Sequence, residues 1–95
     1  MKFQWDPKKA VDNLKNHGVS FDEASTVFGD PLAATIPDPV HSADEVRFVT
    51  MGHSANQRLV VVVHADRGDD IRIISARRAT GGEKKKYAEG KRKGR

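Results

Sequence analysis

The sequence predicts a single α+β domain in which two N-terminal helices pack on a small antiparallel β-sheet and a short basic helix follows. Residues 1–28 contain two stretches with helical apolar spacing, each with its own start and stop signals. From residue 33 the apolar period changes to two, and residues 59–63 form a continuous apolar run typical of a central strand. The chain has 95 residues, which suits one domain with a shallow, surface-built site.

The N-terminal segment predicts a short edge strand over residues 3–5 and a first helix after it. Asp6 can accept hydrogen bonds from the free amides of the first turn, and Pro7 suits the first helical position. Gly18 ends this helix, because glycine adopts the left-handed closing conformation at little cost. Its expected apolar stripe consists of Ala10, Val11 and Leu14.

The second helix is predicted from the S-x-x-E capping box of Ser20 and Glu23. It ends at the breaker Gly29-Asp30-Pro31. Its expected buried face consists of Phe21, Ala24, Val27 and Phe28.

Four further strands are expected at residues 34–36, 45–51, 59–63 and 71–76, and their short links favour antiparallel pairing. Thr80 and Glu83 form a second capping box that opens a basic helix over residues 82–89. Gly90 is expected to end this helix. We therefore predict one domain over residues 1–90 and a disordered basic tail over residues 91–95.

Composition and charge narrow the range of functions. Residues 77–95 hold nine lysines and arginines against two glutamates, a net charge of +7, whereas residues 1–76 carry a net charge of −3. This asymmetry favours a polyanion or an acidic protein as partner, with a solubilising tail as the alternative. The chain has no cysteine and no apolar run as long as a membrane span requires, so we expect a cytoplasmic protein that does not contact membranes.

Charged side chains on otherwise apolar strands are the strongest chemical signal. Glu45 and Arg47 are two residues apart and are expected on one face of a strand. Arg72 is expected on the same face as Arg78, and Arg77 on the other. Several guanidinium groups over one sheet indicate an anion site, whereas an ion pair such as Glu45–Arg72 is the structural alternative.

The remaining polar residues predict no metal and no cofactor. Asp38, His41 and Asp44 lack a recognised ligand spacing. His17 ends the first helix, where its cation would favour the helix dipole, and it is also an acid–base candidate together with the other histidines. Tyr87 is expected either to pack on the sheet or to stack on a base or handle a proton.

Several short strings occur in the order and spacing of one known family. They are Phe3-x-Trp5-Asp6-Pro7-x-Lys9-Ala10, Asn13-x-Lys15-Asn16-His17-Gly18-Val19-Ser20-Phe21-x-Glu23-Ala24, Val27-Phe28-x-Asp30-Pro31, Glu45-x-Arg47, Gly52-x-Ser54, Arg58-Leu59-x-Val61-Val62 and Arg72-Ile73-Ile74-Ser75-Ala76-Arg77-x-Ala79-Thr80, then Glu83 and Tyr87. From Phe3 to about Tyr87 the chain resembles the BrnT family of type II toxins. The segment from Lys91 lies outside this resemblance.

The resemblance implies a fold similar to RelE-type ribonucleases and a metal-independent RNA endonuclease that arrests translation and growth. It also implies an antitoxin similar to BrnA, with a ribbon-helix-helix region through which the complex contacts operator DNA. Carried over residue by residue, the expected catalytic positions are Glu45, Arg47, Arg72 and Arg77, followed by His17 and Tyr87. The expected RNA-binding residues are Arg78, Lys84, Lys85 and Lys86.

The chemistry of metal-free RNA cleavage fits these residue types. Such cleavage needs an activated 2′-hydroxyl, a stabilised pentavalent phosphate and a protonated leaving oxygen. Arg47, Arg72 and Arg77 suit the phosphate, while Glu45 and His17 both remain as the base. Two other interpretations remain open: a non-enzymatic RNA-binding module, and a domain that mainly binds a protein partner.

Overall fold

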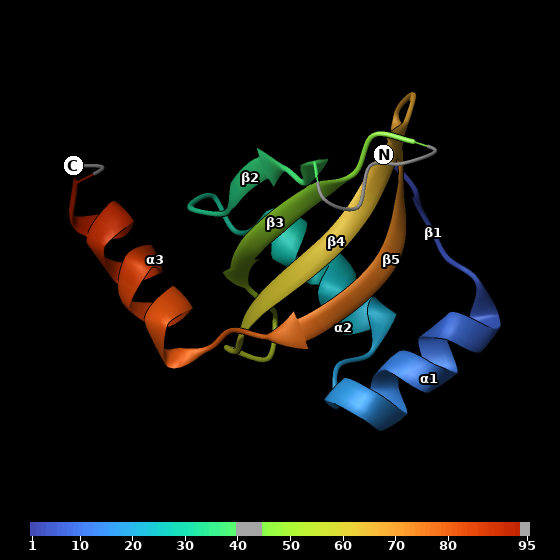
Figure 1. Cartoon of the computed structure of the whole chain (residues 1–95), viewed down its shortest axis with the longest axis horizontal. Helices are drawn as coiled ribbons and strands as arrows, with labels where there is room; N and C mark the ends of the chain where they lie inside the picture. The colour runs from blue at the N-terminus through green and yellow to red at the C-terminus, as the bar shows by residue number, and fades with distance from the viewer. Residues whose placement is uncertain (40–44, 94–95) are drawn as a thin grey trace.

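The computed structural model describes residues 1–39 and 45–93 as an α+β fold (Figure 1). In chain order the elements are β1 (Phe3–Gln4), α1 (Pro7–His17), α2 (Phe21–Thr26), the 3-10 turn η1 (Val27–Gly29), β2 (Ala34–Pro37), β3 (Phe48–His53), β4 (Leu59–Arg67), β5 (Asp70–Arg78) and α3 (Gly81–Lys93). No helix among the described residues has the length and apolar character needed to cross a membrane.

The sheet has five strands in the order β1-β5-β4-β3-β2, and it is mixed rather than antiparallel as predicted. Strands β2 to β5 pair antiparallel, but β1 runs parallel to β5, with Phe3 beside Ile71. The Ile71 amide also donates to the Lys2 carbonyl at 2.8 Å. A two-residue strand has no local pattern that specifies its partner, so the sequence pattern alone did not reveal this pairing.

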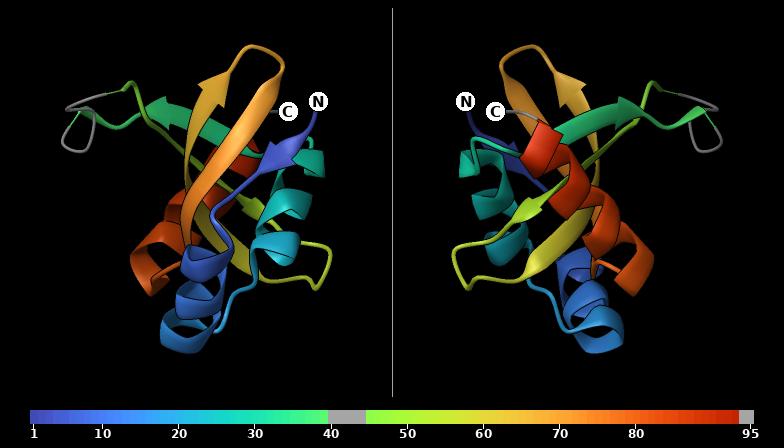
Figure 2. Two further views of the ribbon diagram at one scale, coloured as in Figure 1. Left: turned by 90° about the vertical axis from the view of Figure 1, so that its right-hand side faces the viewer. Right: turned by 90° about the vertical axis from the view of Figure 1, so that its left-hand side faces the viewer.

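Helices cover both faces of the sheet (Figure 2). On one face, α2 and the segments flanking it form the main core with the inward side chains of β4 and β5, and α1 packs beside them. This core contains Val19, Phe21, Ala24, Val27, Val60, Val62, Ile73 and Ala76. On the opposite face, Tyr87 of α3 packs against a smaller cluster of Leu59, Val61 and Ala79. We call this opposite side the α3 face.

A β-bulge in β5 changes which side chains share a face. Val62 pairs with Ala76 and Val63 with Ser75, but His64 pairs with Ile73, so Ile74 is an additional residue. Ile73 and Ala76 therefore both point into the main core although they are three residues apart. Arg72 and Arg77, next to them, both point to the α3 face. This corrects the predictions that these two arginines lie on opposite faces and that Arg72 shares a face with Arg78.

The buried side of α1 also differs from the prediction. Val11 and Leu14 are 67% and 52% exposed, whereas the polar Asn13 is buried. Its amide nitrogen donates to the carbonyl oxygens of Val19 and Ala76 at 2.8 and 2.9 Å, and its carbonyl oxygen accepts from the Ala76 amide at 3.1 Å. These hydrogen bonds attach α1 to β5, so polar anchoring rather than an apolar stripe orients the helix.

The predicted helix starts are confirmed. Asp6 accepts from the Lys9 amide at 3.0 Å, and Ser20 accepts from the Glu23 amide at 2.9 Å. Thr80 and Glu83 exchange hydrogen bonds as a capping box should. Gly18 ends α1 with φ of 69°, in the left-handed region.

Several predicted boundaries change, and β4 extends to Arg67 where the predicted strand ended at residue 63. Strand β3 begins at Phe48, so Glu45 and Arg47 lie before the strand rather than within it, and Val46 is exposed. Helix α2 ends at Thr26, where a 3-10 turn takes over. Helix α3 continues through Gly90 to Lys93, so the backbone of residues 91–93 is helical where a disordered tail was predicted. Residues 94–95 of the predicted tail lie outside the described residues.

Candidate functional site

Glu45 lies among three arginines at one end of the sheet, and we call these four residues the Glu45 cluster. Its Oε2 accepts from Arg67 Nη2 at 3.2 Å, its Oε1 accepts from Arg72 Nη2, and Arg47 Nε lies 3.8 Å from Oε1. Arg67 comes from the end of β4 and Arg72 from the start of β5. The predicted ion pair between Glu45 and Arg72 is thus present.

Positive charge exceeds negative charge within the Glu45 cluster. One carboxylate faces three guanidinium groups, and each of the four side chains keeps part of its surface exposed. The buried Arg72 Nε–H makes no hydrogen bond to any described residue. A guanidinium with an unused donor, in a group with surplus positive charge, suits an anion with several acceptor oxygens.

Arg67 is the member of the cluster that the sequence analysis missed. It lies in the link between the strands predicted at residues 59–63 and 71–76, whereas the structure places it at the end of β4. The signal that could have identified Arg67 is the register between the two neighbouring strands. Arg67 lies opposite Asp70, two residues before Arg72 on the neighbouring strand, so the hairpin brings both cations to the same end.

Arg77 lies farther along the same face and is held by α3. Its Nη1 and Nη2 donate to the two carboxylate oxygens of Glu83 at 2.8 and 2.9 Å. The Arg77 hydrogen bonds lower the pKa of Glu83 to about 2 against the opposing effect of burial. Arg77 follows Arg72 by five positions along β5, about 16 Å of extended chain. Arg77 is therefore separate from the Glu45 cluster, although it shares a face of β5 with Arg72.

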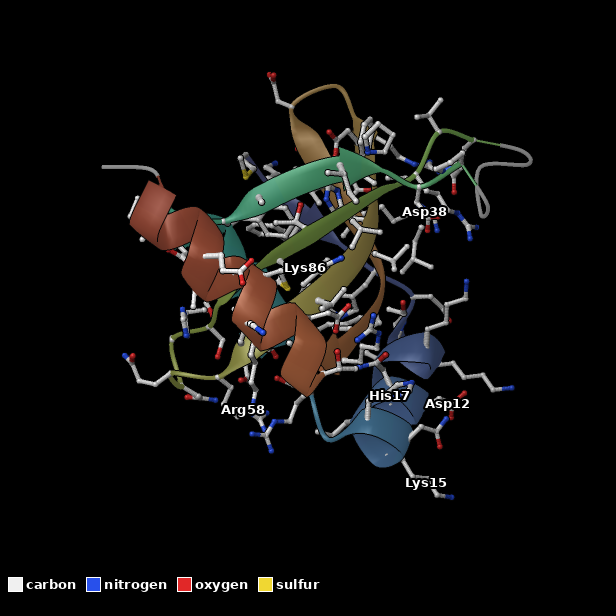
Figure 3. All side chains as sticks on the ribbon, turned by 60° about the vertical axis from the view of Figure 1, so that its left-hand side comes forward. Asp12, Lys15, His17, Asp38, Arg58 and Lys86 are labelled. Carbon is white, nitrogen blue, oxygen red and sulfur yellow. The ribbon has the colours of Figure 1, made fainter. Side chains whose placement is uncertain are left out.

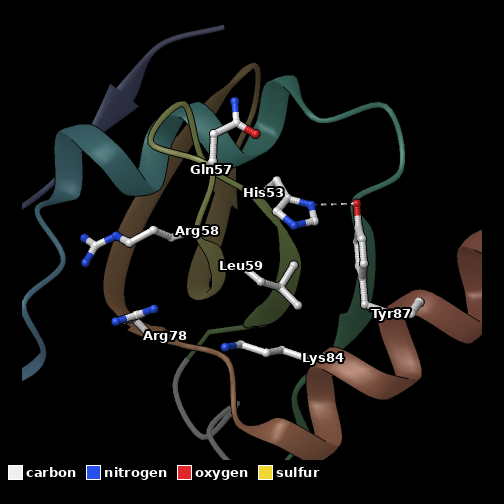
Figure 4. A pocket seen from close by; sticks show the side chains of 8 residues that line it. His53, Gln57, Arg58, Leu59, Arg78, Lys84 and Tyr87 are labelled. Carbon is white, nitrogen blue, oxygen red and sulfur yellow. Dashed lines mark hydrogen bonds between the residues drawn. The ribbon is translucent and has the colours of Figure 1, made fainter.

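A second basic region is a cleft of about 390 Å³ beside α3 at the other end of the sheet (Figure 4). We call it the end cleft. It lies between the β3–β4 hairpin, the end of β5 and α3. Its lining residues are His53, Gln57, Arg58, Leu59, Arg78, Lys84, Tyr87 and Ala88.

Tyr87 attaches α3 to the body of the protein. Its hydroxyl donates to Asp30 at 2.6 Å and lies 3.3 Å from His53 Nδ1. Burial, followed by the hydrogen bond and charge of Asp30, raises the pKa of Tyr87 to about 12. Burial would raise the pKa of Asp30, but hydrogen bonds from Tyr87 and from the His53 and Leu32 amides outweigh it and lower that pKa. Tyr87 is therefore a protonated donor near neutral pH.

Arg58 is largely occupied in a structural network. Its guanidinium donates to both carboxylate oxygens of Glu23 and, at 2.9 Å, to the Gly18 carbonyl. Ser54 donates to Glu23 at 2.7 Å. The Arg58 hydrogen bond is the main reason that the pKa of Glu23 falls to about 2. This network fastens the β3–β4 hairpin to α2.

His17 is not brought to the Glu45 cluster. It is exposed at the end of α1, beside Gly18, which contacts Arg58 just before the start of β4 (Figure 3). The Glu45 cluster contains Arg67 at the end of β4, and nine residues of strand span about 27 Å. His17 and Glu45 therefore lie near opposite ends of the sheet.

The predicted RNA-binding lysines lie on different sides of α3. Lys84 lines the end cleft. Lys86 (Figure 3) lines two other, mainly apolar pockets between α3 and the sheet. Lys85 is exposed and lines neither region. The lysines thus offer positive charge around the helix rather than at a single point.

His64, another acid–base candidate, is poorly suited to a surface reaction. His64 is 2% exposed, bonded to Thr50 at 2.7 Å and Asp66 at 2.9 Å, and its pKa is lowered because burial disfavours the imidazolium. His41 and Asp44 lie outside the described residues. Within residues 1–39 and 45–93, no three histidine, cysteine or acidic side chains form a group able to hold a metal.

Comparisons with known proteins agree with this fold. A profile of the family described as "Ribonuclease toxin, BrnT, of type II toxin-antitoxin system" matches residues 5–83. The crystal structure of the Brucella abortus ribonuclease toxin BrnT is similar, with a TM-score of 0.67 and 25% identity, covering 84% of this chain and 97% of that one. A search of curated proteins found no match. Because the profile spans most of the sequence, this chain belongs to the BrnT family, the ribonuclease toxins of type II toxin–antitoxin systems.

Proposed function

We propose that the chain is a metal-independent RNA endonuclease and that the Glu45 cluster binds the phosphate that is cleaved. The observation that carries this proposal is the gathering of three partly exposed guanidinium groups around the Glu45 carboxylate. Arginine presents donors in a fork that fits phosphate oxygens, and it does so without a metal. The membership of a ribonuclease toxin family supports RNA as the source of that phosphate.

The proposed reaction is an internal transfer within the RNA. The 2′-hydroxyl loses its proton and its oxygen bonds to the adjacent phosphorus, while the bond from phosphorus to the 5′-oxygen breaks and that oxygen takes up a proton. The products are a 2′,3′-cyclic phosphate and a 5′-hydroxyl. Arg47 and Arg72 stabilise the negative charge that builds on the phosphate, and losing one such donor typically costs about 10²–10³ in rate.

Glu45 is a better candidate than His17 for the base. Its carboxylate lies beside Arg47 and Arg72, within the group proposed to hold the phosphate. His17 lies near the far end of the sheet, so it cannot reach the same 2′-hydroxyl. A base must come within hydrogen-bond reach of the proton that it removes, and of these two candidates only Glu45 satisfies this requirement at the cluster.

On one side of the cleaved bond, the RNA follows the α3 face from the Glu45 cluster toward α3. Arg77 lies along this path, and Lys84, Lys85 and Lys86 add positive charge around the helix. Contacts of this kind are with the phosphate backbone and carry little sequence information. Binding should therefore weaken steeply as salt concentration rises.

The proposed partner is an antitoxin of the BrnA type, whose ribbon-helix-helix region places the complex on operator DNA. A type II system supplies a protein that neutralises the toxin. The described surface includes exposed apolar side chains near the Glu45 cluster, at Ile36 and Val46. A partner that covers this apolar edge would also block the cluster, which explains neutralisation without a change in the toxin's own fold.

The decisive experiment is cleavage of a labelled RNA by purified, antitoxin-free protein with EDTA present throughout. The double variant Arg47→Gln/Arg72→Gln tests the cluster. The matched control Lys8→Gln/Lys9→Gln removes the same charge from the exposed start of α1. We expect discrete fragments ending in a 2′,3′-cyclic phosphate from the native protein and the control, and at least about a hundredfold slower cleavage from the cluster variant.

Two outcomes would contradict the proposal. Equal cleavage by a correctly folded cluster variant would show that the reaction occurs elsewhere. Intact RNA that is nevertheless bound by the native protein would indicate a non-enzymatic RNA-binding module instead.

A further inference from the structure

The end cleft has the size and wall chemistry of a small-ligand site. Its volume of about 390 Å³ falls within the range of about 300–1,000 Å³ usual for such sites. It lies at the opposite end of β4 from Arg67, so it is separate from the Glu45 cluster. Leu59 and Ala88 contribute apolar surface to its lining.

One side of the end cleft offers two cations that no described acidic side chain neutralises. Arg78 and Lys84 are both exposed, and among the residues that the structure describes neither side chain forms an ion pair. Arg58 beside them differs, because Glu23 and Gly18 already occupy its donors. In Figure 4 the amine of Lys84 extends across the cleft toward Arg78. Two cations facing one space suit a phosphate group.

The other side offers two aromatic rings in fixed positions. His53 and Tyr87 meet edge to face, with ring centroids 5.0 Å apart and planes at 80°. Asp30 holds both residues, because it accepts from the Tyr87 hydroxyl at 2.6 Å and from the His53 backbone amide at 2.8 Å. Aromatic surfaces held in this way bind nucleobases with little loss of conformational entropy.

We propose that the end cleft is a nucleotide-binding subsite. Arg78 and Lys84 bind a phosphate, and the attached base lies on Leu59 against the rings of His53 and Tyr87. This inference rests on the proposed function, because the nucleotide belongs to an RNA whose cleaved phosphate lies at the Glu45 cluster. Since the two sites lie at opposite ends of β4, the subsite anchors the RNA several nucleotides from the cleaved bond.

The first test measures nucleotide binding without cleavage. Nucleoside 3′-monophosphates, with inorganic phosphate as the second probe, are titrated into ¹³C-labelled, antitoxin-free protein while the Leu59 and Ala88 methyl and Tyr87 ring signals are followed. We expect the nucleotides to shift these signals saturably, and inorganic phosphate to bind more weakly and leave Leu59 unshifted. Arg78→Gln/Lys84→Gln should weaken nucleotide binding at least about tenfold.

The matched control is again Lys8→Gln/Lys9→Gln, which removes the same charge from α1. Both cleft positions are exposed, so folding should be retained, and thermal denaturation verifies it. Equal weakening in the control would show general electrostatic attraction and overturn the subsite. Unshifted Leu59, Ala88 and Tyr87 signals with nucleotides, or equal effects of inorganic phosphate, would also overturn it.

The second test uses RNA length. The KM for cleavage should fall as the RNA is lengthened until it reaches the end cleft, and Arg78→Gln/Lys84→Gln should abolish this fall in KM. In a plot of the logarithm of the RNA-binding constant against the logarithm of salt concentration, the slope should become less steep by about one unit for each lost phosphate contact. Nucleotide binding without any RNA cleavage would refute the proposed endonuclease and leave the subsite standing, whereas cleavage with no length dependence would refute the subsite alone.

Discussion

The hydroxyl of Tyr87 in α3 donates a 2.6 Å hydrogen bond to the carboxylate of Asp30, the residue that follows the 3-10 turn η1. Asp30 also accepts from the backbone amides of Leu32 and His53. One carboxylate therefore joins the end of β3, the loop after η1 and the basic helix. The position of the end cleft depends on this junction, because His53 and Tyr87 form one of its walls.

Tyr87→Phe should loosen α3 without unfolding the domain. The substitution removes one donor from a carboxylate that keeps two backbone amides, so we expect a loss of about 1–2 kcal/mol in the free energy of unfolding. Hydrogen exchange in α3 should quicken more than in β4. Denaturation by urea and amide exchange measure the two effects, and unchanged exchange in α3 would show that the hydroxyl does not hold the helix.

The hydroxyl of Tyr87 should also make the folded protein less stable in alkali. Because folding raises the pKa of Tyr87 from its ordinary value of 10 to about 12, its contribution is complete below pH 10 and is lost as pH rises through 12. Urea midpoints of the native protein should fall across this window more than those of Tyr87→Phe. Parallel curves for the two proteins would contradict the prediction.

Acid should weaken the network around Glu23. The pKa of this carboxyl falls from 4.5 to about 2 on folding, so its contribution is complete above pH 4.5 and is lost as pH decreases through 2. We expect this loss to be on the order of 2 kcal/mol. Glu23→Gln should be less stable than the native protein at pH 7 and should approach it near pH 2, as measured by chemical denaturation.

Asn13 should be more important to stability than the apolar residues beside it. Asn13→Leu removes three hydrogen bonds and leaves the buried Ala76 backbone groups unpaired, at an expected cost of about 2–4 kcal/mol. Val11→Ser on the exposed side of the same helix should change stability by less than about 0.5 kcal/mol. Thermal denaturation compares the two variants, and a larger effect at Val11 would reverse our assignment of the buried side.

Arg77→Lys separates a role in the reaction from a role in holding α3. Lysine keeps the charge but cannot donate to both oxygens of Glu83, and exposed ion pairs contribute at most about 1 kcal/mol, so stability should change little. If Arg77 also contacts RNA along the α3 face, cleavage should slow about tenfold or more. RNA cleavage at the native rate would assign Arg77 to the helix alone.

Local features of the fold could be predicted from the sequence because they depend on residues that lie close together in the chain. The caps at Asp6, Ser20 and Thr80 depend on side chains within three residues of the amides they satisfy. The central strand β4 follows from its apolar run. The ion pair of Glu45 with Arg72 was also foreseen as the structural alternative, since it needs only two oppositely charged side chains on neighbouring strands.

Features that depend on residues far apart in the chain could not be predicted from the sequence. The bulge at Ile74 arises from the register between β4 and β5, and it alone places Arg72 and Arg77 on one face. The parallel pairing of β1 depends on β5, which lies in the last third of the chain. Asn13 was not among the predicted buried residues of the first helix, because its partner, the Ala76 backbone, lies 63 positions away in the chain. The continuation of α3 through Gly90 likewise opposed a local stop signal.

The sequence by itself determined the α+β class, the helix starts, the basic C-terminal end and the resemblance to a toxin family. Each of these depends on residue type and short-range spacing. Only the tertiary structure decided that Arg67 joins Glu45, that His17 lies near the other end of the sheet, and that Arg78, Lys84 and Tyr87 share a cleft. Strand register and helix packing bring such residues together, and the energies that select them come from contacts between segments far apart in the chain.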